Sequence, residues 1–160
     1  MSTGRPKVLI TGASGLLGSL VLRSLSEKYA FSGLSRRPVP DIPHTAASIE
    51  DLDALRRASA GMEMVLHLAA ETQDENDWDR VLQSTIGGTL NMYRAAQEAG
   101  VRRVIYMSSG STMCGYERGE DSPYGMLAAN QLSALRPNDR MITNLDPPRP
   151  DSFYAVGKLF

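Results

Sequence analysis

The segment 7–19, KVLITGASGLLGS, constrains the fold more than any other part of the chain. It joins a short apolar run at residues 8–10 to a glycine-rich turn, and apolar residues at helical spacing follow over residues 15–25. Glycines fit a tight turn, let backbone amides approach a phosphate and allow the helix to pack closely on the strand. The helix N-terminus adds N–H groups and a favourable dipole. This arrangement predicts a site for the pyrophosphate of a dinucleotide.

The spacing of Gly12, Gly15 and Gly18 is G-x-x-G-x-x-G, close to but distinct from the dinucleotide fingerprint G-x-G-x-x-G. Glycines behind a strand can also form nothing more than a turn. A strand before them and a helix after them are, however, the context that the fingerprint requires. A phosphate-binding P-loop is disfavoured, because Ser19 stands where its lysine would follow the last glycine.

Strand and helix patterns alternate along the chain, which predicts an α/β fold with a doubly wound parallel sheet, a Rossmann fold. Gly87 and Gly88 are expected to weaken the middle of a long third helix. Residues 115–152 show no such pattern and are expected to form a long irregular loop, and residues 153–160 begin another helix. The predicted strands are 8–10, 29–35, 45–49, 64–68 and 104–107, and the predicted helices are 15–25, 50–60 and 77–99.

The charge balance and the cysteine count restrict the class of partner and the compartment. A length of 160 residues suits one domain, and 17 basic against 18 acidic side chains give no electrostatic basis for binding nucleic acid or an anionic membrane. No apolar run reaches the roughly 18 residues of a membrane span. Cys114 is the only cysteine, which favours a reducing, cytoplasmic setting. We therefore expect a small-molecule partner.

The second predicted strand ends in Ser35, Arg36 and Arg37, at the position that distinguishes the two nicotinamide dinucleotides. NAD sites often place an acid there for the ribose 2′-hydroxyl, whereas an arginine accommodates the 2′-phosphate of NADP. These residues favour NADP, with Arg36 as the stronger candidate for a charge-assisted contact, and NAD is the alternative. The competing interpretation is that the two arginines belong to a solvated surface loop.

Five ordered motifs carry a resemblance to a known family: TGASGLLG at 11–18, HLAA at 67–70, GGTLNMYRAA at 87–96, VIYMSSGS at 104–111 and YAVGK at 154–158. The chain resembles the extended branch of the short-chain dehydrogenase/reductase superfamily, which includes NAD-dependent epimerases, dehydratases and sugar or uronate dehydrogenases. The resemblance implies hydride transfer between the cofactor and a hydroxyl or keto carbon of a sugar, nucleotide sugar or uronate. It also implies a homodimer, formed through the long helix.

The family's catalytic Y-x-x-x-K is matched by Tyr154 and Lys158, and this spacing places both side chains on one helix face. The resemblance implies that Tyr154 is the general acid/base. It further implies that Lys158 is the electrostatic partner of Tyr154 and a ligand of the nicotinamide ribose. A nearby ammonium lowers the pKa of a tyrosine from near 10. The family's serine that binds the substrate oxygen corresponds to Ser109 when counted from the strand, with Ser111 as the runner-up.

The chain also departs from the family pattern. Ser48 replaces an acid that usually contacts adenine, and Thr85 replaces an asparagine. Relatives continue beyond Phe160, so the C-terminal substrate region is expected to be missing. The residues expected to contact the cofactor are Gly12, Ser14, Gly15, Leu16, Leu17, Gly18, Ser35, Arg36, Arg37, Ile49, Leu68, Ala69, Ala70, Thr85, Met107, Tyr154 and Lys158.

Two further expectations concern the histidines and the alternative function. His67 is interpreted as scaffolding for the loop near the cofactor, and no metal site is expected, because His44 is the only other histidine. A non-catalytic NADP-binding sensor, or an inactive fragment, is the alternative to an enzyme, since a fold alone does not decide function.

Overall fold

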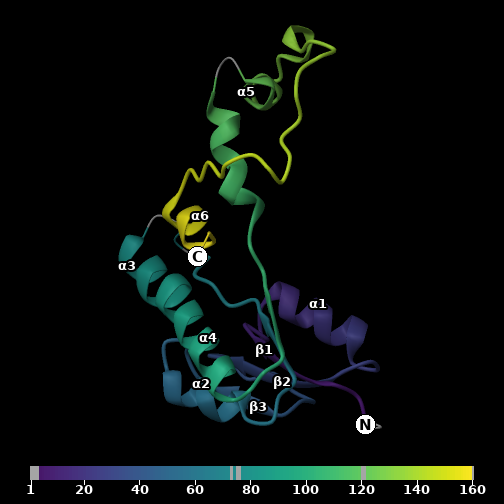
Figure 1. Cartoon of the computed structure of the whole chain (residues 1–160), viewed down its shortest axis with the longest axis vertical. Coiled ribbons are helices and arrows are strands. Elements are labelled where there is room, and N and C mark those ends of the chain that lie inside the picture. Colours follow the sequence, from purple (N-terminus) through teal and green to yellow (C-terminus); the bar gives the residue numbers. More distant parts are fainter. Residues whose placement is uncertain (1–3, 73, 75–76, 120–121, 160) are drawn as a thin grey trace.

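The computed structural model describes residues 4–72, 74, 77–119 and 122–159. Its centre is a parallel sheet with the strand order β3-β2-β1-β4-β5, with α1 (Leu16–Leu25) on one face and α2 (Leu52–Ser59) and α4 (Gly88–Glu98) on the other (Figure 1). The predicted doubly wound α/β fold is confirmed. The strands are β1 (Lys7–Thr11), β2 (Ala30–Ser35), β3 (His44–Ala46), β4 (Met64–His67) and β5 (Arg103–Tyr106).

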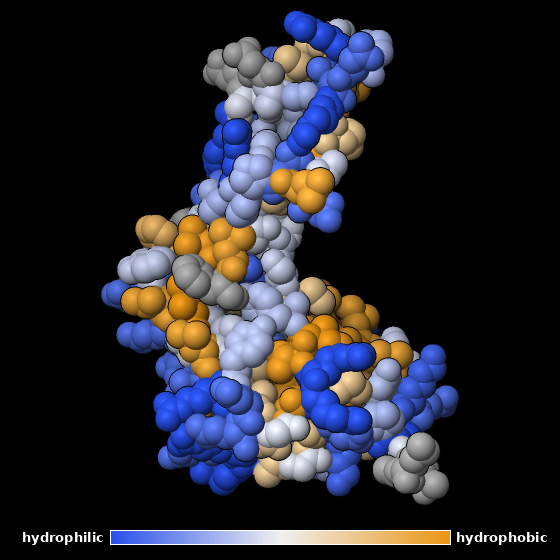
Figure 2. All heavy atoms as spheres, viewed as in Figure 1, coloured by the Kyte–Doolittle hydropathy of each residue, from blue (hydrophilic) through white to orange (hydrophobic). Residues whose placement is uncertain are grey.

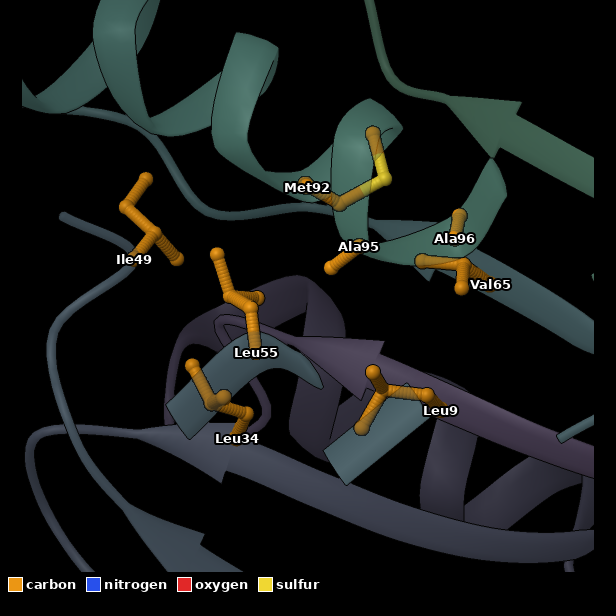
Figure 3. Close-up of a cluster of buried hydrophobic side chains, with 8 residues drawn as sticks. All are labelled: Leu9, Leu34, Ile49, Leu55, Val65, Met92, Ala95 and Ala96. Carbon is orange, nitrogen blue, oxygen red and sulfur yellow. The ribbon is translucent and has the colours of Figure 1, made fainter. Parts of the chain in front are cut away.

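Alternate residues of β1 face the two helical layers, as the pleat of a strand requires. Leu9 packs on the side of α2 and α4, and Val8 and Ile10 pack with α1. Figure 3 shows the first of these clusters, in which side chains from three strands meet Leu55 of α2 and Met92 of α4. Because both faces of β1 are buried, the strand is a continuous apolar run, and the glycine turn that follows it is held firmly at the carboxyl end of the sheet.

The predicted helix 77–99 is helical along its length but not a regular α-helix. It consists of α3 (Trp78–Arg80), the π-helical segment η1 (Val81–Gly87) and α4. At Gly88 a β-carbon would lie 2.5 Å from Cγ1 of Ile49, so the helix approaches the segment after β3 more closely than another residue allows. The periodicity of apolar residues does not distinguish these helix types, and π segments often occur at functional sites.

Part of the segment expected to be an irregular loop is helical. It contains the last four residues of the 3₁₀ helix η2 (Gly110–Arg118), together with α5 (Pro123–Ala128) and the short 3₁₀ turn η3 (Leu132–Ala134). Ser109 and Ser122 cap the first two of these, and Pro123 occupies the first turn of α5, where proline is favoured. Local capping therefore forms helices in a segment without apolar periodicity.

The segment from η2 to residue 150 extends away from the sheet as an arm (Figure 1). Figure 2 shows a wide notch between this arm and the sheet, with hydrophobic surface beside it over α1. The chain then returns to the sheet through α6 (Phe153–Gly157). Over the residues that the structure describes, no helix combines the length and the apolar character needed to cross a membrane.

Candidate functional site

A cleft of about 750 Å³ opens at the carboxyl ends of β1 to β4. In open α/β sheets this edge is where ligands bind. Its wall combines the glycine turn, the end of β2, the segment after β3, the loop after β4 and the α3–η1 helix. Among the predicted cofactor contacts, those on this wall are Gly12, Ser14, Gly15, Leu16, Leu17, Gly18, Ser35, Arg36, Arg37, Ile49, Leu68, Ala69 and Ala70.

The glycine turn forms a cradle that only glycines permit. Gly12 has φ +72°, and a β-carbon there would lie 2.8 Å from the amide nitrogen of Ala69. At Gly18 a β-carbon would lie 2.5 Å from the carbonyl oxygen of Ala13. Gly15 is the N-cap of α1, and no side chain caps the helix there. The backbone amides of the first helical turn therefore face the cleft without a capping side chain, which fits a pyrophosphate group.

The end of β2 places two arginines at the rim of the same cleft. Ser35 is buried, and its hydroxyl donates a hydrogen bond of 2.8 Å to the carbonyl oxygen of Arg37 and lies 2.9 Å from Nε2 of His44. These contacts hold the backbone at the point where Arg36 and Arg37 leave the strand. Both arginine side chains are exposed and line the cleft, so they are free of the sheet and available to a bound anion.

His67 lies beneath the cleft and connects β4 to β1 and α4. Its Nδ1 lies 2.6 Å from the hydroxyl of Thr11, and its Nε2 lies 3.0 Å from the hydroxyl of Thr89. Thr89 donates its proton to the carbonyl oxygen of Thr85, so it accepts from Nε2–H of His67, and Nδ1 accepts from Thr11. Burial, with a smaller contribution from the nearby Lys158, lowers the pKa of His67 to about 4.

Four predicted contacts with the cofactor do not line the cleft: Thr85 and Met107, and also Tyr154 and Lys158 of the predicted catalytic group. Thr85 is fully buried, and its hydroxyl accepts a hydrogen bond of 3.0 Å from the backbone amide of Glu71, so it supports the loop after β4 from below. Met107 follows β5, and its amide donates to the carbonyl oxygen of His67 at 3.1 Å. In this structure Thr85 and Met107 are arranged to support the wall of the cleft.

The predicted catalytic residues gather at the carboxyl end of β5, next to the cleft. The tyrosyl hydroxyl of Tyr106 donates to the carbonyl oxygen of Gly157 at 3.5 Å, and Ser108 donates to that of Lys158 at 3.1 Å. These bonds fix α6, which carries Tyr154, to the end of the strand. Tyr154, Lys158 and Ser109 therefore lie on neighbouring segments, although none of the three is on the wall of the cleft.

Residue Lys158 is only 2% exposed, and its ammonium faces an aromatic ring. Its Nζ lies 4.2 Å from the centroid of the Tyr106 ring, a cation–π geometry, and that ring stacks on His67 at a centroid distance of 5.7 Å. Burial lowers the pKa of Lys158 to about 8 and raises that of Tyr106. The side chain is thus a partly desolvated cation held between α6 and β5.

The two serines considered for the substrate oxygen contact one another. The hydroxyl of Ser109 donates to that of Ser111 at 3.1 Å and accepts from the Ser111 amide at 3.2 Å. Ser109 is therefore the N-cap of η2 in this structure. Its hydroxyl must turn from this cap to reach a substrate.

Further residues on the wall of the cleft were not singled out from the sequence. Glu71 and Thr72 follow the predicted contacts after β4, whereas Arg80, Gln83 and Ser84 come from α3 and η1. Residues 80, 83 and 84 share one face of a helix. This spacing of polar residues just before Gly87 was the only feature of the sequence that could have indicated them as cleft residues. The periodicity alone does not show which way that polar face points.

Residues 8–160 match the family model described as the NAD dependent epimerase/dehydratase family. The chain belongs to this family. The resemblance predicted from the five motifs is confirmed, and the position of the cleft agrees with it.

Three of the proteins that the chain resembles are dehydrogenases of sugars or sugar acids. The chain is 30% identical over 154 residues to L-arabinose 1-dehydrogenase (NAD(P)(+)) of Haloferax volcanii, covering 96% of this chain and 58% of the relative. It is 32% identical over 161 residues to the NAD-dependent glucose-6-phosphate dehydrogenase of the same organism, covering 94% and 58%. The crystal structure of uronate dehydrogenase from Agrobacterium tumefaciens superposes with a TM-score of 0.76 at 25% identity, covering 98% and 53%. The chain therefore spans little more than half the length of these proteins.

Proposed function

We propose that the chain is the NAD(P)-binding domain of a dehydrogenase that acts on a sugar, nucleotide sugar or uronate. The observation that carries this proposal is the glycine cradle at the uncapped N-terminus of α1, which opens into a cleft at the carboxyl edge of the sheet. When bound, the nicotinamide cofactor supplies hydride transfer to or from a carbon that bears a hydroxyl or keto group. The sugar dehydrogenases among the relatives support this class of substrate.

We assign three roles to the residues at the end of β5. Tyr154 exchanges the proton of the substrate hydroxyl, Lys158 is the electrostatic partner of Tyr154, and Ser109 hydrogen-bonds the reacting oxygen. The position of α6 against β5 supports this grouping. The Lys158 ammonium, desolvated and close to the ring of Tyr106, is suited to an electrostatic role, because a charge acts more strongly where water is excluded.

Two measurements test the proposed function. Fluorescence titration with NADPH and NADH is expected to show saturable binding of at least one of them. Production of NADPH or NADH is then followed with L-arabinose, glucose 6-phosphate and glucuronate as candidate substrates. The proposal is contradicted if neither NADPH nor NADH binds. Binding without turnover of any sugar favours the alternative of a non-catalytic sensor.

We propose NADP as the preferred cofactor, because Arg36 and Arg37 both line the cleft at the end of β2. Replacement of Arg36 by alanine is expected to weaken NADPH binding by about tenfold, the loss of one charge-assisted hydrogen bond, and to leave NADH binding unchanged. Titration of both cofactors measures the ratio. Arg57→Ala is the matched control, since it removes the same charge from an exposed site on α2 outside the cleft.

An unchanged preference for NADPH in Arg36→Ala would exclude Arg36 as the ligand of the 2′-phosphate. A preference for NADH in the unmodified protein would assign the arginines to the solvated rim and NAD to the cleft.

We also propose a cytoplasmic homodimer. The support for the dimer is α4, on which Leu90 is 64% exposed and Tyr93 is 42% exposed. Light scattering coupled to size-exclusion chromatography is expected to give twice the mass of the chain, and Leu90→Glu is expected to reduce that mass by half. A monomer at micromolar concentration would contradict the proposed assembly.

A further inference from the structure

Arg80 lines the cleft from the side of the α3–η1 helix. Its side chain is 56% exposed, and its guanidinium lies 3.9 Å from the Glu71 carboxylate and 3.5 Å from that of Asp77. Both distances exceed those of a direct hydrogen bond. The head group is therefore held near two acids by charge alone, without the short bidentate geometry that makes an arginine–carboxylate pair strong.

The backbone of Arg80, in contrast, is fixed. Asp77 is the N-cap of α3, and its carboxylate accepts a hydrogen bond of 3.1 Å from the amide of Arg80. The π-helical segment begins at the next residue, Val81, which is fully buried. The side chain thus starts from a rigid point at the wall of the cleft, and only its exposed end is free to rotate.

The charge in the cleft differs from that of the whole chain. The chain carries a net charge of −1, whereas the residues on the cleft wall include the cations Arg36, Arg37 and Arg80 against the carboxylates Glu50 and Glu71. Glu71 is only 5% exposed and already lies beside Arg80. Asp77, which is not on the wall, also lies 3.5 Å from Arg80. The three exposed arginine side chains nevertheless line one concave site, which concentrates the field of its charges and favours an anionic ligand.

We propose that Arg80 is a ligand for an oxyanion bound in the cleft, with its guanidinium turning from Glu71 and Asp77 to the anion. The inference rests on the proposed dinucleotide site and adds a cation on the side of α3, away from α1 (Figure 1). Two molecules of the proposed reaction carry such a group: the cofactor, in its pyrophosphate, and an acidic sugar, in its carboxylate. A guanidinium binds either through two parallel N–H bonds.

The test compares Arg80→Gln with Arg80→Lys. The matched control is Arg94→Gln, on the neighbouring α4, whose side chain is 62% exposed and ion-paired with Glu98. Calorimetric titration with ADP-ribose, which carries a pyrophosphate, and with adenosine, which does not, examines the cofactor as the source. Titration with glucuronate and with glucose, at saturating cofactor, examines the acidic sugar.

For one of the two anionic ligands, Arg80→Gln is expected to weaken binding by about tenfold to a hundredfold. Arg80→Lys is expected to restore part of the affinity, and adenosine, glucose and the Arg94→Gln control are expected to show no change. Unchanged affinity for both anions in Arg80→Gln overturns the inference. The proposed function fails separately, if the unmodified protein binds neither NADPH, NADH nor ADP-ribose.

Discussion

Replacing Tyr154 by phenylalanine is expected to lower the rate of NAD(P)-dependent sugar oxidation by about 10²- to 10⁴-fold, the range typical of a general acid/base. Phenylalanine keeps the ring and removes only the hydroxyl, so the packing of α6 against β5 is retained. The N-cap of α6, in which Ser152 accepts a hydrogen bond of 3.2 Å from the Ala155 amide, is also unaffected. The loss therefore falls on turnover, and the affinity for NADPH is expected to stay within a factor of two or three.

The measurement is the initial rate of NADPH or NADH production with the sugar that gives the highest rate. Tyr29→Phe is the matched control, because it removes the same hydroxyl from a ring that packs on Phe31 next to the α1 face of the sheet. Equal rates in Tyr154→Phe and the unmodified protein would refute the assigned role. A fall in cofactor affinity as large as the fall in rate would indicate a structural role instead.

Acidification is expected to reduce the free energy of unfolding by about 3 kcal/mol between pH 6.5 and pH 4, through protonation of His67. Burial lowers the pKa of His67 to about 4 from its ordinary value of 6.5. Between these values the unfolded chain binds a proton that the folded chain does not, so stability falls as the pH falls. Below about pH 4 both states are protonated and this contribution no longer changes.

Protonation also breaks one bond of the hydrogen-bonded chain. Neutral His67 accepts from Thr11 at Nδ1 and donates to Thr89 from Nε2, whereas the protonated ring donates from both nitrogens. Thr11 also accepts from the amide of Ala69, at 3.4 Å, in the loop that lines the cleft. We therefore expect cofactor affinity to fall in the same pH range.

Urea unfolding of the unmodified protein and of His67→Gln, from pH 7 to pH 4, measures this contribution. The glutamine variant is expected to be less stable at pH 7 and to lose about 3 kcal/mol less on acidification. His44→Gln, which removes the other histidine, tests whether the effect belongs to His67. Parallel pH profiles for His67→Gln and the unmodified protein would contradict the assignment.

Much of the fold follows from short stretches of sequence. The strand, glycine turn and helix at the N-terminus were predicted with boundaries close to those observed, because a buried parallel strand needs a continuous apolar run and the turn needs glycine. Asp51 similarly marks the start of α2, since its carboxylate accepts from the amide of Ala54. Such features depend on residues within one or two turns of each other.

The π-helical segment and the structure of the arm could not be predicted from the sequence in the same way. Gly88 makes close approach to Ile49 possible, yet which segment approaches it depends on how the chain returns after β3. In the arm, Gly115 donates to the carbonyl oxygen of Arg149 at 2.7 Å, a contact between residues separated by more than thirty positions. No periodicity over a short window contains that information.

For the candidate site the same division holds. Residues 12–18 and 35–37 can be identified from the local sequence, because neighbouring residues determine the geometry of a turn and the end of a strand. Three other features arise only on folding. They are the buried hydrogen-bonded chain from Thr11 through His67 to Thr89, the Tyr106 ring beneath the Lys158 ammonium, and the position of Arg80 on the cleft wall. Each feature brings together side chains from separate strands and helices, or places a side chain on a cleft that several elements share. The distances between these groups depend only on how the sheet and its helices pack.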